Sequence, residues 1–194
     1  IDIMKEMGVE IKTGIEVGKD ITIAELRKQG YKAFYIAIGC QGGRRPNIPG
    51  DNSIGTYTAV DFLKVSNTGS LSFDDETVVV GGGNVAIDAA RVAKRSGAKK
   101  VTMLCLESED IMPASKLEIE EAREDGVEII TSRGPKEIKL IDNKVSSVVF
   151  KKCTSVFDSS KRFNPTYNED DTIEINGTKV IYAIGQQIEW GNLL

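Results

Sequence analysis

The chain has 194 residues, of which 40% are hydrophobic and 28% are charged, the balance of an ordinary globular protein. Its formal net charge of -4 gives no reason to expect nucleic acid as a partner, and its apolar runs are too short to cross a membrane. Because histidine is absent, histidine acid–base catalysis, Ser-His-Asp triads and most zinc sites are excluded, and we expect neither a catalytic side chain nor a metal site.

The first 50 residues give a mixed pattern. A short strand is predicted at residues 8–11, a short helix at 23–28 and a strand at 31–38, which is apolar enough to be buried on both faces. Glycine and proline then cluster over residues 39–50, a composition that indicates a crossover between domains.

The central part of the chain alternates strands with helices. The predicted segments are helices over 58–65, 84–96 and 114–125, and strands over 77–80, 100–106 and 127–131. From residue 77 the order is strand, helix, strand, helix, strand, which is typical of half a Rossmann unit with a parallel sheet.

The pattern changes after residue 131. Residues 137–141 and 145–152, joined by a turn at 142–144, predict an antiparallel hairpin. Residues 157–171 are polar and rich in turn formers, and 178–184 predict a last buried strand. The predicted fold class is therefore α/β, a Rossmann-like parallel sheet with an antiparallel β-hairpin or meander excursion.

The most informative stretch is the turn after the strand at 77–80. It has the form Gly81-x-Gly83-x-x-Ala86 and consists of Gly81, Gly82, Gly83, Asn84, Val85 and Ala86. Glycine turns the chain tightly and lets backbone N–H groups approach a pyrophosphate, while the helix that follows offers unpaired donors and a favourable dipole. These six residues are predicted to bind a dinucleotide; the other interpretation is a structural glycine-rich turn of a different doubly wound protein.

Glu107 ends the second predicted strand, roughly twenty residues beyond the glycine turn, where a carboxylate can accept hydrogen bonds from both hydroxyls of an adenosine ribose. A carboxylate there repels a 2′-phosphate, and no arginine follows immediately; Lys116 is the nearest cation. We therefore expect NAD(H) to be favoured over NADP(H). The other interpretation is a solvated glutamate in an acidic turn with Glu109 and Asp110.

Three cysteines, Cys40, Cys105 and Cys153, are widely spaced and form no Cys-x-x-Cys pair. This usage favours reduced thiols in a cytoplasmic protein over a disulfide framework. The chain begins with Ile1 and shows no signal peptide, which we interpret as a piece of a longer protein. The acidic segment from Glu118 to Asp125 is interpreted as a solvated helix face.

Three segments of the central part form a recognisable set: Gly81-Gly-Gly-Asn-Val-Ala-x-Asp88-x-Ala-Arg91, Met112-Pro113-Ala114 and Glu124-Asp125-Gly126-Val127. Together they resemble the small subunit of glutamate synthase and the related part of dihydropyrimidine dehydrogenase. Ala37-Ile38-Gly39 and Ala183-Ile184-Gly185-Gln186 resemble the two crossovers that these proteins make between their flavin and nicotinamide domains. The resemblance covers nearly the whole chain.

The family carries FAD and NAD(P)H on two nested Rossmann-like domains, so the resemblance implies a division of this chain. Residues 48–175 would be the NAD(P)-binding domain, residues 1–47 a remnant of the flavin-binding domain, and residues 176–194 the return crossover into it. The Gly185-Gln186 turn would then lie near the nicotinamide.

This chain departs from the family in two respects. The family's FAD fingerprint and Gly-Asp flavin motif are missing, and there is no iron–sulfur cysteine cluster. FAD is therefore expected only in the full-length parent, whose flavin domain and possibly iron–sulfur domains would be the partners of this chain. Members that use NADPH carry basic residues where this chain has Leu106-Glu107-Ser108-Glu109.

The predicted function is the nicotinamide-binding domain of a multi-domain flavin oxidoreductase, which positions nicotinamide for hydride transfer to or from a flavin. The isolated chain is expected to be inactive. A non-catalytic nucleotide-sensing module is an alternative. A disulfide reductase similar to thioredoxin reductase is disfavoured, since it needs a Cys-x-x-Cys pair in or near this domain.

Overall fold

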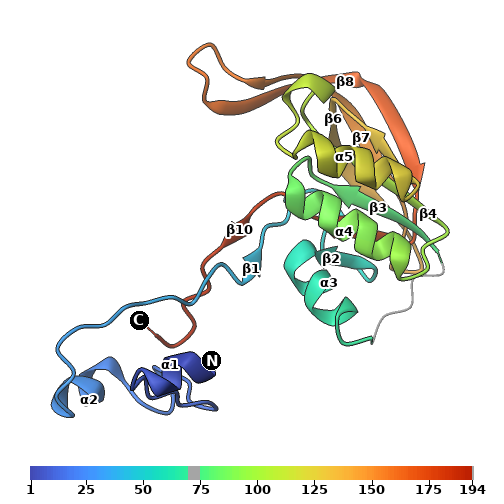
Figure 1. Cartoon of the computed structure of the whole chain (residues 1–194). Helices are drawn as coiled ribbons and strands as arrows, with labels where there is room; N and C mark the ends of the chain where they lie inside the picture. Colours follow the sequence, from blue (N-terminus) through green and yellow to red (C-terminus); the bar gives the residue numbers. More distant parts are fainter. Residues whose placement is uncertain (70–74, 194) are drawn as a thin grey trace. The chain divides into compact units, whose positions relative to one another are not determined.

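The computed structural model describes residues 1–69 and 75–193 (Figure 1). The chain divides into two compact units. The first combines residues 1–40 with the C-terminal segment that begins at Ile188, and the second comprises residues 41–187.

The first unit contains two short helices, α1 (Asp2–Glu6) and α2 (Ile23–Lys28). The prediction of α2 is confirmed: Thr22 caps it, accepting a hydrogen bond from the Glu25 backbone N–H while the Glu25 carboxylate accepts one from the Thr22 backbone N–H. None of residues 1–40 is buried.

The strands predicted at 8–11 and 31–38 are wrong. Both segments lack regular secondary structure, and the Tyr35 side chain is 95% exposed. A strand needs a neighbour to accept its backbone hydrogen bonds, and the described residues pair no strand with 31–38. The prediction that residues 31–38 are buried on both faces is therefore also wrong.

The second unit is built on a parallel sheet with the strand order β2-β9-β3-β4-β5. The strands are β2 (Thr56–Thr58), β9 (Lys179–Tyr182), β3 (Glu76–Val80), β4 (Lys100–Leu104) and β5 (Val127–Ile130). Every neighbouring pair is parallel. The predicted fold class is confirmed.

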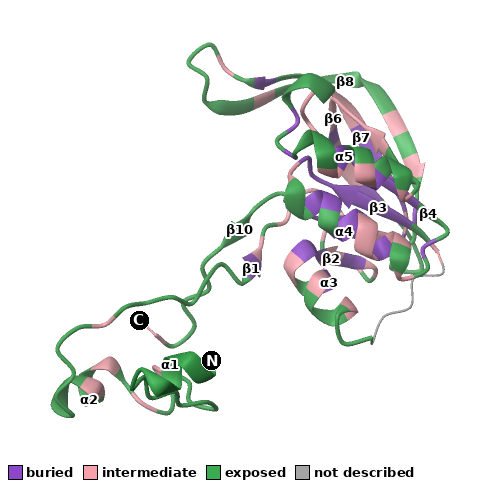
Figure 2. Cartoon of the chain, viewed as in Figure 1, coloured by how far each residue is buried: buried purple, intermediate pink, exposed green. Residues whose placement is uncertain are grey.

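Three helices cover one face of this sheet: α3 (Ala59–Ser66), α4 (Asn84–Arg95) and α5 (Lys116–Glu124). Figure 2 shows how burial concentrates on β3 and on α4. Four alanines of α4 at positions 86, 89, 90 and 93 are fully buried, and their small side chains let the helix lie close to Val79 and Met103 of the sheet.

An antiparallel sheet covers the opposite face. Its strands are β6 (Arg133–Ile141), β7 (Lys144–Phe157) and β8 (Phe163–Asn176). Phe150 and Val148 of β7 pack against Leu104 and Tyr182 of the parallel sheet. Because both faces are covered, the strands of the parallel sheet are apolar on both sides, as the run at 77–80 indicates.

The predicted β6–β7 hairpin is confirmed, with Asp142 and Asn143 at positive φ of 50° and 61° in its turn. The prediction of a turn-rich loop over 157–171 is wrong for its second half, because β8 runs from Phe163 to Asn176 and pairs with β7. Most β8 residues are exposed and polar, so the few apolar residues that alternate along the strand mark it only weakly in the sequence.

The remaining elements are short. β1 (Gly42–Gly43) pairs antiparallel with β10 (Gln186–Gln187), and η1 (Glu109–Ile111) is a single 3-10 turn. The two glycine-rich crossover segments of the sequence thus meet through backbone hydrogen bonds. Within residues 1–69 and 75–193, no helix has the length and apolar character needed to cross a membrane.

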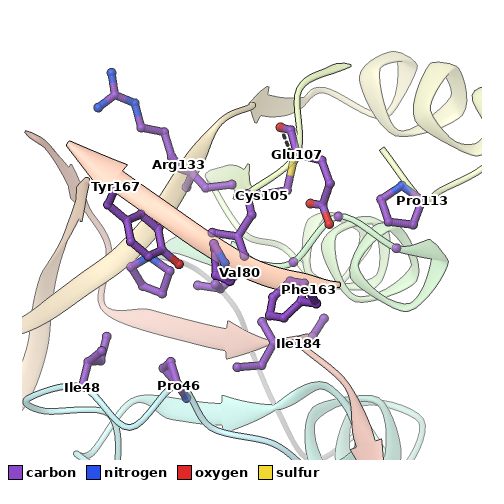
Figure 3. A pocket seen from close by; sticks show the side chains of 18 residues that line it. Pro46, Ile48, Val80, Cys105, Glu107, Pro113, Arg133, Phe163, Tyr167 and Ile184 are labelled. Atoms are coloured by element: carbon purple, nitrogen blue, oxygen red, sulfur yellow. Dashed lines mark hydrogen bonds between the residues drawn. The ribbon is translucent and has the colours of Figure 1, made fainter. Parts of the chain in front are cut away.

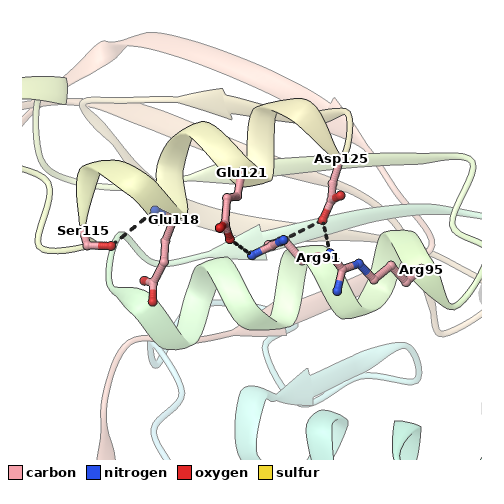
Figure 4. Close-up of polar contacts among 6 residues, drawn as sticks. All are labelled: Arg91, Arg95, Ser115, Glu118, Glu121 and Asp125. Atoms are coloured by element: carbon pink, nitrogen blue, oxygen red, sulfur yellow. Dashed lines mark hydrogen bonds and ion pairs between the residues drawn. The ribbon is translucent and has the colours of Figure 1, made fainter.

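Ion pairs join α4 to α5 beside the sheet (Figure 4). Arg91 binds Glu121 and also donates to Asp125 at 2.7 Å, and Arg95 donates to the same Asp125 oxygen at 2.9 Å. The Arg91 hydrogen bond holds the pKa of Asp125 below its ordinary value. Arg91 is 21% exposed and Arg95 62% exposed, so solvent screens the Arg91 pair less.

We predict that Arg91→Ala lowers the melting temperature more than Arg95→Ala does, because Arg91 makes two of the three contacts and is better shielded. Equal losses in the two variants would contradict this account.

The Asp125 contribution to stability is present above the carboxyl's ordinary pKa of about 3.9 and is lost as pH falls through its lowered folded pKa. The stability difference between wild type and Asp125→Asn, measured by thermal unfolding, should therefore be constant from pH 8 to 5 and shrink below about pH 4. A stability difference between wild type and Asp125→Asn that does not shrink below about pH 4 would contradict this prediction.

Candidate functional site

The candidate site lies where β3 and β9 end side by side. In the strand order, β4 and β5 lie on one side of β3, and β9 lies on its other side. The chain passes from β3 through α4 to β4, and from β9 it runs on to β10. The loops that follow β3 and β9 therefore leave in different directions and open a crevice at the carboxyl ends of the strands. In open α/β sheets this is the position at which ligands bind.

A cavity of about 430 Å³ occupies one side of this crevice (Figure 3). Its volume lies within the range of about 300–1,000 Å³ that is usual for small-molecule sites. Gly81, Gly82, Gly83 and Glu107 line it, together with the ends of β3 and β4. The wall from β8 consists of Phe163, Pro165 and Tyr167.

A second cavity of about 230 Å³ lies beyond the glycine turn. It shares Gly83 and Ala183 with the first cavity. Its other lining residues include four predicted site residues: Asn84, Val85, Gly185 and Gln186. The two cavities therefore adjoin at Gly83, and together they follow the carboxyl ends of the parallel strands.

Gly81 and Gly83 differ in what excludes a side chain. Gly81 has φ +144°, and a Cβ there would lie 2.4 Å from the Ala183 carbonyl oxygen, so the neighbouring strand β9 requires glycine at this position. Gly83 has φ -94° and ψ 176°, which any residue can adopt, and a Cβ there would meet nothing within 4 Å. No neighbouring atom among the described residues excludes a side chain at position 83, so the missing side chain leaves the backbone open to a ligand.

Gly83 is also the N-cap of α4, and this helix end is suited to an anion. No side chain caps it, and its first turn carries no acidic residue. The Asn84 side-chain oxygen faces elsewhere, because it accepts a hydrogen bond from the Ser115 backbone N–H at 3.0 Å. The amides at the start of α4 and the helix dipole therefore make this an electropositive end.

The Asn84 contact fixes the segment before α5 against the turn. The Ala114 backbone N–H donates to the Gly82 carbonyl at 3.0 Å, and Pro113 lines the larger cavity. This explains why Met112-Pro113-Ala114 accompanies the glycine turn in the sequence. The sequence predicted Asn84 as a binding residue but did not indicate this tie.

The structure brings eight of the nine predicted site residues to the walls of the two cavities. The exception is Ala86, which is fully buried behind the turn and packs in the helix–sheet core. Glu107 lies over the turn: a Cβ on Gly82 would be 2.8 Å from its carboxylate Oε2. A carboxylate therefore lies against Gly82 of the turn.

The two buried cysteines are not activated thiols. All three are free thiols, and no group of three or more potential metal ligands occurs in residues 1–69 and 75–193. Burial, followed by the Glu107 charge, raises the pKa of Cys105 to about 12, and burial also raises the pKa of Cys153. Neither buried thiol is thus a reactive thiolate at neutral pH.

The β8 wall of the larger cavity was not predicted from the sequence. Phe163, Pro165 and Tyr167 alternate along β8, so a period of two places them on one side of the strand. These apolar residues stand out from the polar stretch around them, and this was the one available signal.

Comparison with known proteins agrees with this geometry. The sequence model of the pyridine nucleotide-disulphide oxidoreductases matches residues 2–190, nearly the whole chain. The chain belongs to this family. The name of the family refers to pyridine nucleotides, and a glycine turn at the end of β3 is in keeping with that name.

Within the family, the resemblance drawn from the sequence motifs is confirmed. The chain is 35% identical over 161 residues to the glutamate synthase [NADPH] small chain of Escherichia coli K12, an alignment that covers 76% of this chain and 34% of that protein. It is 34% identical over 145 residues to the NAD-dependent dihydropyrimidine dehydrogenase subunit PreT of the same strain, covering 74% and 34%. The chain thus spans about a third of the length of these relatives.

A solved structure, Mycobacterium tuberculosis FprA in complex with NADPH, superposes with a TM-score of 0.73. The match covers 89% of this chain and 54% of that one at 20% identity, and it shows the shared fold. The names of these relatives include both NADPH and NAD, so they do not decide which nucleotide this chain prefers.

We predict that Gly81→Ala destabilises the fold strongly, whereas Gly83→Ala does so only slightly. Gly81→Ala should lower the free energy of unfolding by more than about 2 kcal/mol, because its Cβ collides with β9 and its φ is unfavourable. Gly83→Ala should change it by less than about 1 kcal/mol, since the space is open and the backbone conformation is permitted. Urea denaturation of the two variants measures this difference, and equal losses would contradict it.

Proposed function

We propose that this chain is the NAD(P)H-binding domain of a flavin oxidoreductase similar to the small subunit of glutamate synthase. The observation that carries the proposal is Gly83, an uncapped helix start whose missing side chain opens onto two adjoining cavities. A pyrophosphate matches these features, since it is an anion that needs backbone N–H donors and close approach to the main chain.

The residues present fit an extended dinucleotide. Backbone N–H groups from Gly82 to Val85 would bind the pyrophosphate. The adenosine half would occupy the larger cavity, which Glu107 lines, and the nicotinamide half the smaller one, which Gly185 and Gln186 line. Ala86 would act only by letting α4 pack close to the sheet.

The polar groups of the larger cavity support a preference for NAD(H). The Glu107 carboxylate can accept hydrogen bonds from both ribose hydroxyls, and its charge would repel a 2′-phosphate. Arg133 is the one cation among the described residues that line this cavity, and its guanidinium already donates to Asp171 at 2.8 Å. A 2′-phosphate would therefore meet a carboxylate without a free cation.

In the mechanism that we propose, this chain contributes positioning. A bound nicotinamide supplies hydride chemistry with a flavin. Gly185 and Gln186 would orient the nicotinamide end, with the β1–β10 pairing holding their turn in place. No side chain at the site needs to exchange a proton, which agrees with the absence of histidine.

The flavin would come from other parts of the parent protein. We propose that residues 1–47 are a remnant of the flavin-binding domain, that 48–175 are the nicotinamide domain, and that 176–194 contain the return crossover, with β9 completing the parallel sheet before the chain crosses over. Because β9 and β10 belong to the compact unit 41–187, that unit is the better guide for an expression boundary. Iron–sulfur domains as further partners, a cytoplasmic location and inactivity of the isolated chain remain parts of the proposal.

A non-catalytic nucleotide-sensing module is the second candidate, since it would need the same turn and cavities. The two candidates differ in whether the parent protein binds a flavin next to the nicotinamide end. A disulfide reductase is disfavoured because the buried thiols of Cys105 and Cys153 are not poised for exchange.

We predict that the purified chain binds NADH saturably and that Gly83→Ala weakens this binding at least tenfold while the fold is retained. The added methyl group would occupy the space in which the pyrophosphate approaches the backbone. Isothermal titration calorimetry measures both affinities. Unchanged NADH affinity in Gly83→Ala, with wild type binding, would contradict the proposed pyrophosphate position.

We predict that Glu107→Arg raises the ratio of NADPH to NADH affinity by at least about tenfold, because it exchanges a repelling charge for an attracting one. Glu120→Arg is the matched control: it makes the same change of charge on the exposed surface of α5, outside both cavities. An unchanged ratio in Glu107→Arg, or an equal shift in both variants, would exclude Glu107 as the residue that contacts the ribose.

A further inference from the structure

The wall of the larger cavity opposite the glycine turn comes from β8, and neither the glycine turn nor Glu107 accounts for it. Phe163, Pro165 and Tyr167 form this wall. Tyr167 is half-buried and lines the cavity, and in Figure 3 its ring reaches from β8 into the cavity. Two aromatic rings and a proline make a flat, apolar surface.

Tyr167 and Glu107 line the same cavity, and Tyr167 also packs beside Leu106, the residue before Glu107. A Cβ on Gly134 would lie 2.5 Å from Tyr167 Cε1 and 2.9 Å from Leu106 Cδ2, so both side chains converge on the Gly134 backbone. Leu106 precedes Glu107 in the chain. Tyr167 therefore lines the same cavity as the residue to which the proposed function assigns the adenosine ribose.

One side of the Tyr167 ring is already occupied. The Lys151 ammonium lies 4.1 Å from the ring centroid, and the same lysine pairs with Glu169 at 2.6 Å. Lys151 over the ring and the approach of Cε1 to Gly134 restrict the rotation of the Tyr167 side chain. The part of the ring that lines the cavity remains available to a planar ligand.

We propose that Tyr167 is an adenine-binding residue, against which the base of the dinucleotide stacks, with Phe163 extending the same wall. This inference rests on the proposed function, because it takes Glu107 as the residue that holds the ribose. Adenine is bonded directly to that ribose, so the base must lie in the same cavity. A purine base can stack on an aromatic side chain, and a tyrosine already held by its neighbours suits this role.

The test compares ligands that contain adenine with one that lacks it. Wild type, Tyr167→Leu and Tyr167→Phe are titrated with NADH, AMP and nicotinamide mononucleotide, and thermal unfolding checks each variant. Tyr167→Leu should weaken NADH and AMP by about tenfold, the effect of losing one stacked base, and leave nicotinamide mononucleotide unchanged. Tyr167→Phe keeps the ring and should retain the wild-type affinities.

Phe163→Leu provides a second variant that does not threaten the fold, since Phe163 is 64% exposed, and it should weaken AMP as well. Phe157→Leu is its control: Phe157 packs edge-on against Phe163 with ring centroids 6.4 Å apart but does not line the larger cavity. AMP affinity that is unchanged in Tyr167→Leu, or lost equally for all three ligands, would overturn the inference while leaving the proposed function intact. Failure of wild type to bind NADH would overturn the proposed function itself.

Discussion

The close approach of Gly81 to the Ala183 carbonyl is the constraint on which the candidate site depends. The glycine turn can pass this close to β9 only because position 81 has no side chain. This passage brings the end of β3 and the end of β9 together and lets the loops beyond them diverge. The two cavities, which meet at Gly83 and Ala183, are a consequence of that divergence.

The layers around the parallel sheet hold this edge in place. Small buried residues of α4 bring the helix start to the end of β3, and Asn84 with Arg91 ties α4 to the segment before α5 and to α5 itself. On the other face, the antiparallel sheet packs through Phe150 and then carries β8 past the larger cavity. The helical layer thus supplies the anion-binding end, and the antiparallel layer supplies the aromatic wall.

The central elements could be predicted because their signals are local. Apolar runs, helix caps and the glycine turn of residues 77–131 each act within a few neighbours, and the structure has these elements within about two residues at most ends. The strand predicted at 31–38 failed because burial of an apolar run depends on a partner strand that a local pattern does not contain. β8 was missed in the opposite case: its sequence is mostly polar, but it forms a strand because it pairs with β7. The contacts of Tyr167 with Gly134 and of Asn84 with Ser115 join residues 31 or more positions apart, so a local sequence pattern does not predict them.

The central claim is that a nicotinamide dinucleotide lies along the strand ends with its pyrophosphate against Gly83. Chemical-shift mapping of backbone amides during an NADH titration tests it most directly. The account predicts the largest changes at Gly82, Gly83 and Val85, with further changes at Glu107 on one side and Gln186 on the other. Changes confined to one cavity with the amides at the start of α4 unaffected, or no saturable changes at all, would contradict it.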